Sequence, residues 1–425
     1  MLRIRLQKMI ILALCMLFAF QLTAQSNIIL YGLSKQGNPS LNTPFDVSSM
    51  DPMTAVVTPL FSSNTGVAVA AGASTFDHGN KRFICWGFDN TNVERIYTAD
   101  IDSGMIINQP LATSRPVEME FDLNKQKTYG LWYDQSTATE YFVSIDLATG
   151  ATTNIASIPY NLVGIGNSTF DSNNARYFCL VGNMGSGGLE LVSINANTGA
   201  VLTSVDLSTT TDAIVNAFEY DVNTNKLHCL ITENDSTVIT SFGDYGKKMF
   251  FGEVDWVTGQ VTKISPAPIL TGEFTGYAIG GIAFDQQSQT YVGLLADDNG
   301  TELTLIDATT GTVVSKVAPS QNFWEIQCDN VSFARSFYDP TNTTGIPTQR
   351  STVKAFPNPA TDYLQLESEH TIQAVTVVNV KGQIVRQLTV TPATNYRLNV
   401  KDLISGTYFM TVQTNKGQEQ ITFIK

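Results

Sequence analysis

Polar side chains stand three or four positions before most of six recurring aromatic residues, and they are the residues of this chain best suited to chemistry. The candidates for a ligand site are Glu118, Asn167, Asn216, Asp329 and Asn330. Carboxylate and amide oxygens are the hard ligands that Ca²⁺ prefers, so Glu118, Asn167, Asn216 and Asp329 form a candidate calcium set. The same groups could instead bond water and backbone inside a wet channel, and this structural interpretation is preferred.

Hydrolytic chemistry has little other support in the sequence. Of the three histidines, His78 is expected in a turn, His228 in a strand and His370 near the end of the chain. There is no recognisable Ser-His-Asp set, no His-Glu-x-x-His helix and no paired-cysteine metal motif. No catalytic residue is therefore assigned, and an enzyme is not the favoured class.

The elements that would hold these side chains repeat with a period of about 50 residues. Each repeat carries an aromatic residue followed by an acid, except the sixth, which keeps only the aromatic. The six pairs are Phe76-Asp77, Phe121-Asp122, Phe170-Asp171, Tyr220-Asp221, Phe284-Asp285 and Phe333-Ala334. A second motif, such as Ile145-Asp146…Thr149-Gly150, recurs between them. Asp bonds to backbone two residues on and Gly accepts a positive φ, so these acids are expected to build turns.

A third repeated position follows each aromatic residue and accepts only Gly or Cys. It holds Gly32, Cys85, Gly130, Cys179, Cys229 and Gly293. Because the position accepts only these small residues, we expect it to be closely packed against the neighbouring sheet. The three cysteines would then lie on different sheets, too far apart to form disulfides, and Cys328 has no evident partner. Free, buried thiols are expected.

Four short strands in each repeat predict an all-β fold, a six-bladed β-propeller over residues 25–337. The first blade would combine residues 27–60 with residues 325–337, so that both chain ends close it and no sheet edge is left open. The innermost strand of each blade lines the central channel, and the candidate ligand residues would ring its mouth. Residues Glu233 to Phe250 are expected to form a long loop over the same rim.

The polar ring is similar, in residue types and register, to the calcium ring of six-bladed propellers of the gluconolactonase and paraoxonase type. That resemblance implies a calcium-dependent, lactonase-like hydrolase in which the metal binds the ester oxygen. Glu118, Asn167, Asn216 and Asp329 would hold the ion.

The N-terminus has the features of a secretory signal peptide, expected over residues 1–24. Arg3, Arg5 and Lys8 precede an apolar run from Met9 to Phe20, which is too short to span a membrane. No transmembrane segment is expected after its removal. The formal net charge of −13 repels phosphate backbones, so nucleic acid is not an expected partner.

The C-terminal residues follow a different pattern. Residues 338–350 read as a linker rich in Pro, Thr, Asn and Gly, and residues 351–425 as short alternating strands of a small β-sandwich. Separate strands are expected at Leu364 to Leu366, Ala374 to Asn379, Gln383 to Leu388 and Tyr396 to Val400.

Motifs in this tail resemble the C-terminal sorting domain of type IX (Por) secretion cargo. They comprise Pro357, Asn358, Pro359, Gly382, Gly406, Tyr408 and Lys425. The resemblance implies recognition by the type IX translocon, removal of the tail, and release from the cell or attachment to its outer surface, in a Gram-negative bacterium. The sequence thus predicts a secreted or surface-attached protein that binds an unknown protein or glycan at the propeller rim without catalysis, with the calcium-dependent hydrolase as the alternative.

Overall fold

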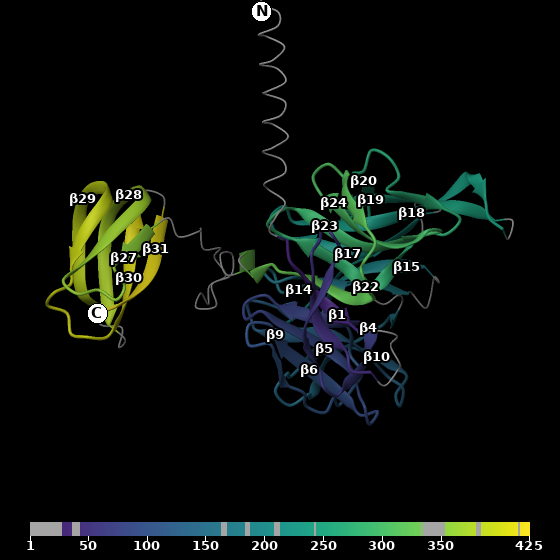
Figure 1. The fold of residues 1–425 in the computed structure, drawn as a ribbon, viewed down its shortest axis with the longest axis horizontal. Coiled ribbons are helices and arrows are strands. Elements are labelled where there is room, and N and C mark those ends of the chain that lie inside the picture. Colours follow the sequence, from purple (N-terminus) through teal and green to yellow (C-terminus); the bar gives the residue numbers. More distant parts are fainter. Residues whose placement is uncertain are drawn as a thin grey trace, which may run out of the picture. The chain divides into compact units, whose positions relative to one another are not determined.

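The computed structural model describes residues 28–35, 43–162, 168–182, 188–207, 213–241, 244–331, 333–334, 353–379, 384–414 and 417–425. The chain divides into two compact units, Met1–Gly345 and Ile346–Lys425. Apart from the helical residues Val331, Phe333 and Ala334, the regular elements within the described ranges are β-strands, so the fold is all-β as expected (Figure 1). Within the described ranges, there is no helix long and apolar enough to cross a membrane. The expected signal peptide, residues 1–24, lies outside the described residues, as does Cys15.

The first unit consists of six antiparallel sheets. One contains β26 (Phe323–Cys328), β1 (Leu30–Ser34), β2 (Asp46–Met50) and β3 (Val57–Ser62). The next contains β4 (Gly66–Asp77), β5 (Arg82–Asp89), β6 (Glu94–Asp100) and β7 (Met105–Asn108). The third contains β8 (Val117–Asp122), β9 (Lys127–Asp134), β10 (Thr139–Ile145) and β11 (Thr152–Ile158).

The other three sheets follow the same plan. One contains β12 (Asn161–Leu162) and β13 (Ser168–Asp171), both paired with β14 (Arg176–Gly182), then β15 (Leu189–Asn195) and β16 (Val201–Asp206). The next contains β17 (Ile214–Asp221), β18 (Lys226–Ile239), β19 (Tyr245–Val254) and β20 (Val261–Lys263), with β21 (Leu270–Gly272) also on β19. The last contains β22 (Gly276–Asp285), β23 (Thr290–Asp297), β24 (Gly300–Asp307) and β25 (Val313–Val317).

One strand from each of the six sheets, here called the inner strand, takes part in a ring. β26, β4, β8, β13, β17 and β22 contact one another in this cyclic order, and β22 contacts β26. Apolar clusters fill the spaces between neighbouring sheets; Phe178 and Leu191 of one sheet, for example, pack with Leu227 and Cys229 of the next. The first unit is therefore propeller-like, with β26 from late in the chain paired to β1.

Asp side chains form the turns as the repeats predict. Asp146 Oδ1 accepts bonds from the backbone N–H groups of Ala148 (2.8 Å) and Thr149 (3.2 Å), and Gly150 has a φ of 72°. Asp122 Oδ1 likewise accepts a bond from the N–H of Asn124 at 2.9 Å, in the turn after β8. The expectation that these acids are structural is confirmed.

The Gly/Cys position is as crowded as predicted, but a different neighbour causes the crowding. A Cβ on Gly32 would lie 2.8 Å from the carbonyl oxygen of Trp324, and one on Gly130 would lie 3.0 Å from that of Val117. Both carbonyls belong to the inner strand of the same sheet and not to the neighbouring sheet. Cys85, Cys179, Cys229 and Cys328 are all buried and free, as expected.

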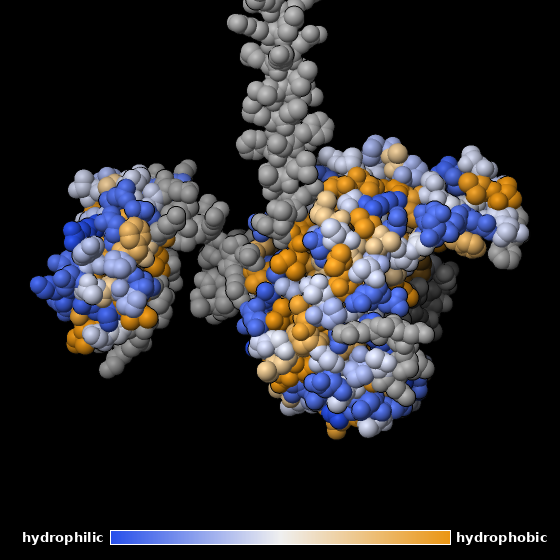
Figure 2. Space-filling model, in the orientation of Figure 1, coloured by the Kyte–Doolittle hydropathy of each residue, from blue (hydrophilic) through white to orange (hydrophobic). Residues whose placement is uncertain are grey.

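The segment from Glu233 to Phe250 is not simply a loop. Most of its described residues extend β18 and β19 into a long hairpin beyond the rest of the sheet (Figure 1). Ile239 and Tyr245 on this hairpin are 62% and 52% exposed, and hydrophobic side chains gather near its end in Figure 2.

The second unit is one five-stranded sheet in the order β27 (Val353–Phe356), β28 (Tyr363–Asn379), β30 (Thr407–Thr414) and β31 (Gly417–Ile424), with β29 (Ile384–Asn399) on β28. The four short strands expected between Leu364 and Val400 are in fact two long ones. Each keeps its pairing across register shifts near Glu367 and Ile372, where the expected breaks lay. One apolar cluster, which includes Leu366, Val375 and Phe423, forms the core of this unit.

Candidate functional site

The inner strands share a local distortion. A β-bulge and a residue with positive φ occur in each of β4, β8, β17, β22 and β26. The residues are Gly72, Glu118, Ala217, Gly280 and Glu325. The matching segment before β13 lies outside the described residues. Because a bulge bends a strand and redirects side chains, this level of the ring, here called the bulge end, is where a site could be built.

The sixth repeat was assigned to the wrong residues by the sequence analysis. Leu30 pairs with Cys328 as Phe83 pairs with Phe76, so Cys328-Asp329 is the sixth copy of the aromatic–acid pair. The position holds Cys in place of the aromatic residue that marks the other five copies. As a result, Glu325 is the residue at the bulge, and Asp329 belongs to the opposite end of the strand.

A cavity of about 150 Å³ lies among the six inner strands. All six residues that directly precede the aromatic position line it. They are Thr75, Glu120, Thr169, Glu219, Ala283 and Gln327. In each repeat, the residue that follows the acid of the aromatic–acid pair lines the other end of the cavity, here called the turn end. Phe333 and Ala334 also lie there. The pair taken for the sixth repeat therefore helps to close the turn end.

Two carboxyl groups of this ring flank β13. Glu120 lies on β8 and accepts a bond from Ser168 Oγ at 2.8 Å. Burial, more than the neighbouring Glu118, raises the pKa of Glu120 to about 8, although the Ser168 bond opposes this. Burial also raises the pKa of Glu219 on β17 well above its ordinary value, and Glu120 adds to the effect. Both groups hold a proton at pH values where a solvated Glu is ionised.

Glu325 differs from these carboxyl groups because one of its oxygens is buried without a hydrogen-bond partner. Its side chain is 1% exposed and lines the cavity. The N–H of Gly72 donates to Oε1 at 2.8 Å, whereas Oε2 is buried without a hydrogen-bond partner. Burial raises the pKa of Glu325 to about 7, although bonds from Ser74 and Gly72 favour the charged form. A Cβ on Gly280 would fall 2.2 Å from Oε1, so the carboxyl group occupies space that only a glycine leaves open.

The structure brings only part of the predicted ligand set together. Glu118 is 4% exposed and lines the cavity. Asn216 is not among the lining residues, and its Oδ1 is buried without a hydrogen-bond partner. Asn330 lines the turn end, where its amide donates to the carbonyl of Phe284 (2.8 Å) and accepts from the N–H of Gln286 (2.9 Å). Asn167 lies outside the described residues.

Asp329 does not belong with the mouth residues. It lies at the turn end, where its carboxylate accepts bonds from the hydroxyl of Tyr31 (3.3 Å) and the N–H of Val331 (3.1 Å). The misassigned sixth repeat is the reason for this error. The four predicted calcium ligands therefore do not fit one ion as a set. Among the described residues, no three His, Cys, Asp or Glu side chains are grouped so that they could hold a metal ion.

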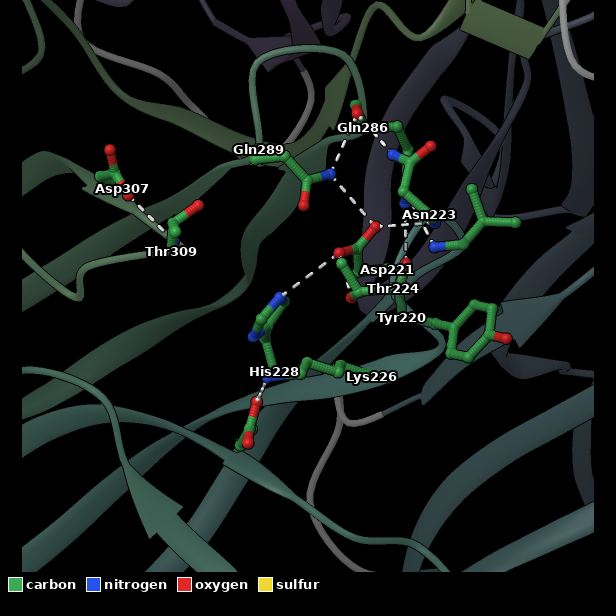
Figure 3. A network of polar contacts seen from close by, with 12 residues as sticks. Tyr220, Asp221, Asn223, Thr224, Lys226, His228, Gln286, Gln289, Asp307 and Thr309 are labelled. Atoms are coloured by element: carbon green, nitrogen blue, oxygen red, sulfur yellow. Dashed lines mark hydrogen bonds and ion pairs between the residues drawn. The ribbon is translucent and has the colours of Figure 1, made fainter.

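The turn end is held by a dense polar network (Figure 3). Asp221 accepts bonds from the N–H of Asn223 (2.9 Å), from Gln289 Nε2 (3.1 Å) and from Thr224 Oγ1. Gln286, on the next sheet, donates to the carbonyl of Tyr220 at 2.7 Å. Burial alone would raise the pKa of Asp221, but the nearby His228, together with the bonds from Thr224, Gln289 and Asn223, outweighs burial and lowers the pKa to about 2. The network joins two neighbouring sheets and has the character of a structural tie.

His228 is close to this network without completing it. Its Nε2 is 3.9 Å from Asp221 Oδ2, and neither ring nitrogen has a hydrogen-bond partner (Figure 3). The ring packs between Phe251 and Phe284. Its place is that of a buried strand residue, as expected, but its nitrogens are less satisfied than the sequence suggested.

In the second unit, the motif residues meet at one end of the sheet. Asn358 Oδ1 accepts from the N–H of Ile424 at 2.9 Å, and Gly406 and Lys425 exchange two backbone bonds of 3.0 and 2.9 Å. The Tyr408 ring stacks on Phe423 at 5.4 Å. Pro357 and Pro359 both follow cis peptide bonds, and Gly382 lies outside the described residues. The opening and the closing segment of the tail are thus tied together.

Comparisons with known proteins identify the tail. Residues 354–425 match the family described as "Secretion system C-terminal sorting domain". No curated protein matches the chain.

Solved structures offer weaker likenesses. TolB from Acinetobacter baumannii has a TM-score of 0.49 and 13% identity, over 71% of this chain and 66% of TolB, just under two thirds of its length. Hydrazine synthase from Kuenenia stuttgartiensis has a TM-score of 0.45 and 12% identity, over 94% of this chain and 67% of that one. Because both scores are below 0.5, the description of the fold rests on the sheets themselves. Residues 354–425 are thus a type IX C-terminal sorting domain, and the chain is a secreted or cell-surface protein that carries a propeller-like region.

Proposed function

We propose that the first unit is a six-bladed β-propeller, exported by the type IX system as a binding module, and that its ligand reaches into the central cavity. The ligand is bound and not transformed. The sequence predicts a protein or a glycan as the ligand of a molecule displayed outside the cell, and the volume of the cavity, about 150 Å³, favours a small molecule or a small group of a larger one. The tail would direct the chain to the translocon, then be removed, with release or surface attachment as the outcome.

One observation supports binding in the cavity above the others. The carboxyl group of Glu325 is buried, lines the cavity and leaves Oε2 without a hydrogen-bond partner. An unpaired buried oxygen costs about 1–3 kcal/mol, a cost that a ligand donor in the cavity would remove. Gly280 leaves the space that the carboxyl group occupies, and Gly72 donates its N–H to Oε1, so the arrangement depends on residues from three sheets.

The calcium-dependent hydrolase remains the second candidate, because Glu118 is buried at the cavity as that hypothesis requires. Its ligand set would have to differ from the predicted one, since Asp329 lies at the turn end. A hydrolase would lose ester or lactone turnover in Glu118→Ala and would gain stability with calcium.

A thermal-shift screen of the purified chain tests the proposal. Glycans, small polar metabolites and CaCl₂ are the probes, and lactone turnover is followed in parallel. A binding module predicts that at least one organic probe raises the melting temperature, less so in Glu325→Gln, with no turnover. Turnover that disappears in Glu118→Ala would replace binding by hydrolysis, and the absence of any stabilising probe would reject the cavity as a binding site.

A further inference from the structure

The described lining of the cavity contains several acidic side chains and almost no basic ones. Glu118, Glu120, Glu219 and Glu325 line it, and none of the described lining residues is Lys or Arg. His78 is the one basic side chain among them, and burial lowers its pKa to about 4, so it is neutral. A ligand that enters this space therefore meets acceptor oxygens without a balancing positive charge.

These carboxyl groups are spread across the cavity. In the cyclic order of inner strands, β26 with Glu325 lies opposite β13, and β13 is flanked by β8 with Glu120 and β17 with Glu219. No three acidic or metal-ligating side chains in the described ranges converge as one metal ion would require. A separation of this kind suits an elongated ligand with a donor at each end.

We propose, on the basis of the binding role above, that the cavity takes a small linear organic cation with primary ammonium groups, one end bonded to Glu325 Oε2 and the other to Glu120 and Glu219. An ammonium group offers three donors and no acceptor, and charge-assisted bonds to carboxylates are roughly twice as strong as neutral ones. A cavity of about 150 Å³ holds a molecule the size of benzene, and a four-carbon diamine is of similar size.

Binding should release protons to the solvent. Without a ligand, Glu120 and Glu325 have pKa values of about 8 and about 7, and the pKa of Glu219 is also raised. A cation beside a carboxyl group favours its ionised form, so the carboxyl proton leaves while the ammonium keeps its own. Tyr220 and Cys328, the other titratable groups in the lining besides Glu118, have pKa values raised by burial and stay neutral near pH 7.

Isothermal titration calorimetry of the purified chain tests this inference. The probes are 1,4-diaminobutane, the uncharged 1,4-butanediol and CaCl₂, each at pH 7 in two buffers of different ionisation enthalpy. We expect the diamine to bind with release of about one to two protons, and its affinity to rise up to about tenfold per pH unit for each proton released. Glu325→Gln should lower the affinity about tenfold or more and reduce proton release, whereas Glu302→Gln, outside the cavity lining, should change neither.

Each contrary outcome has a distinct meaning. Equal binding of the diol, diamine binding without proton release, calcium binding in place of the diamine, or no effect of Glu325→Gln would overturn the ammonium assignment. If glycans or other neutral probes bind in a Glu325-dependent manner and the diamine does not, this inference fails while the proposed binding role stands. If no probe binds at all, both fail. Unfolding curves of the variants establish that each is folded.

Discussion

The two ends of the channel are built from the same six strands and differ in how their polar groups are satisfied. At the turn end, Asp221, Gln286 and Asn330 find partners on neighbouring sheets or turns (Figure 3), although His78 Nδ1 and Asp122 Oδ2 are buried there without a hydrogen-bond partner. At the bulge end, Glu325 leaves an oxygen unpaired, and burial together with the nearby Glu120 raises the pKa of Glu219. The bonds that join Asp221, Gln286 and Asn330 across sheets indicate a structural role, and the unpaired carboxyl oxygen of Glu325 in the cavity lining indicates a place for a ligand.

The largest loss of stability should come from removing the hydrogen bonds of Asn330 at the turn end. Asn330→Leu removes both the acceptor for the N–H of Gln286 and the donor to the carbonyl of Phe284. Two buried backbone groups then lose their partners, at about 1–3 kcal/mol each, so the free energy of unfolding should fall by about 3 kcal/mol in urea denaturation. A loss below about 1 kcal/mol would mean that this end is not a structural tie.

A smaller loss is expected where a side chain is added at the bulge end. Gly280→Ala places a Cβ 2.2 Å from Glu325 Oε1, at a φ of 69°. Strain of this kind costs about 1–3 kcal/mol, so a loss of about 2 kcal/mol is expected. In a Glu325→Ala background the contact is absent, so the loss of stability caused by Gly280→Ala should be smaller by about 1 kcal/mol or more in the double-mutant cycle. Strictly additive losses would show that Glu325 does not occupy this space.

The third expected effect is a change in the pH dependence of stability, which is small for each single pH unit. The folded chain keeps the protons of Glu120 and Glu325 at pH values where the unfolded chain has lost them. It then binds more protons than the unfolded state, so the free energy of unfolding should fall as pH rises from about 5 toward 7–8. Glu120→Gln should reduce this slope by about 1 kcal/mol per pH unit, measured by urea denaturation at several pH values. An unchanged slope would argue that Glu120 is solvated.

Residue types predicted the repeats better than they predicted the site. Asp-x-x-Thr-Gly turns follow from local hydrogen bonding, which one short segment can specify by itself, and Asp146 behaves accordingly. The tight Gly/Cys position was recognised too, although the crowding atoms belong to the bulged strand of the same sheet. Local chemistry of this kind can be read from one repeat alone.

The carboxyl groups of the cavity depend on register, which the sequence shows less directly. Glu120 and Glu219 directly precede an aromatic residue, whereas the search was confined to positions three and four before it. Glu325 was missed because Cys328 replaces the aromatic residue of the sixth repeat. Alignment of the acids alone, with Asp329 as the sixth, would have found it. The bulges have no such signal, because Glu118 and Glu325 are not residues that favour a positive φ.

The ionisation of Glu325 with and without a ligand tests the central claim most directly. In ¹³C NMR of the chain with labelled Glu carboxyl carbons, the resonance missing in Glu325→Gln identifies this group. The account predicts a titration midpoint near pH 7 in the free protein, in line with a pKa of about 7, and a fall of about one pH unit or more with saturating 1,4-diaminobutane. A midpoint near pH 4.5 in both samples would show an ordinary solvated carboxylate and would contradict the account.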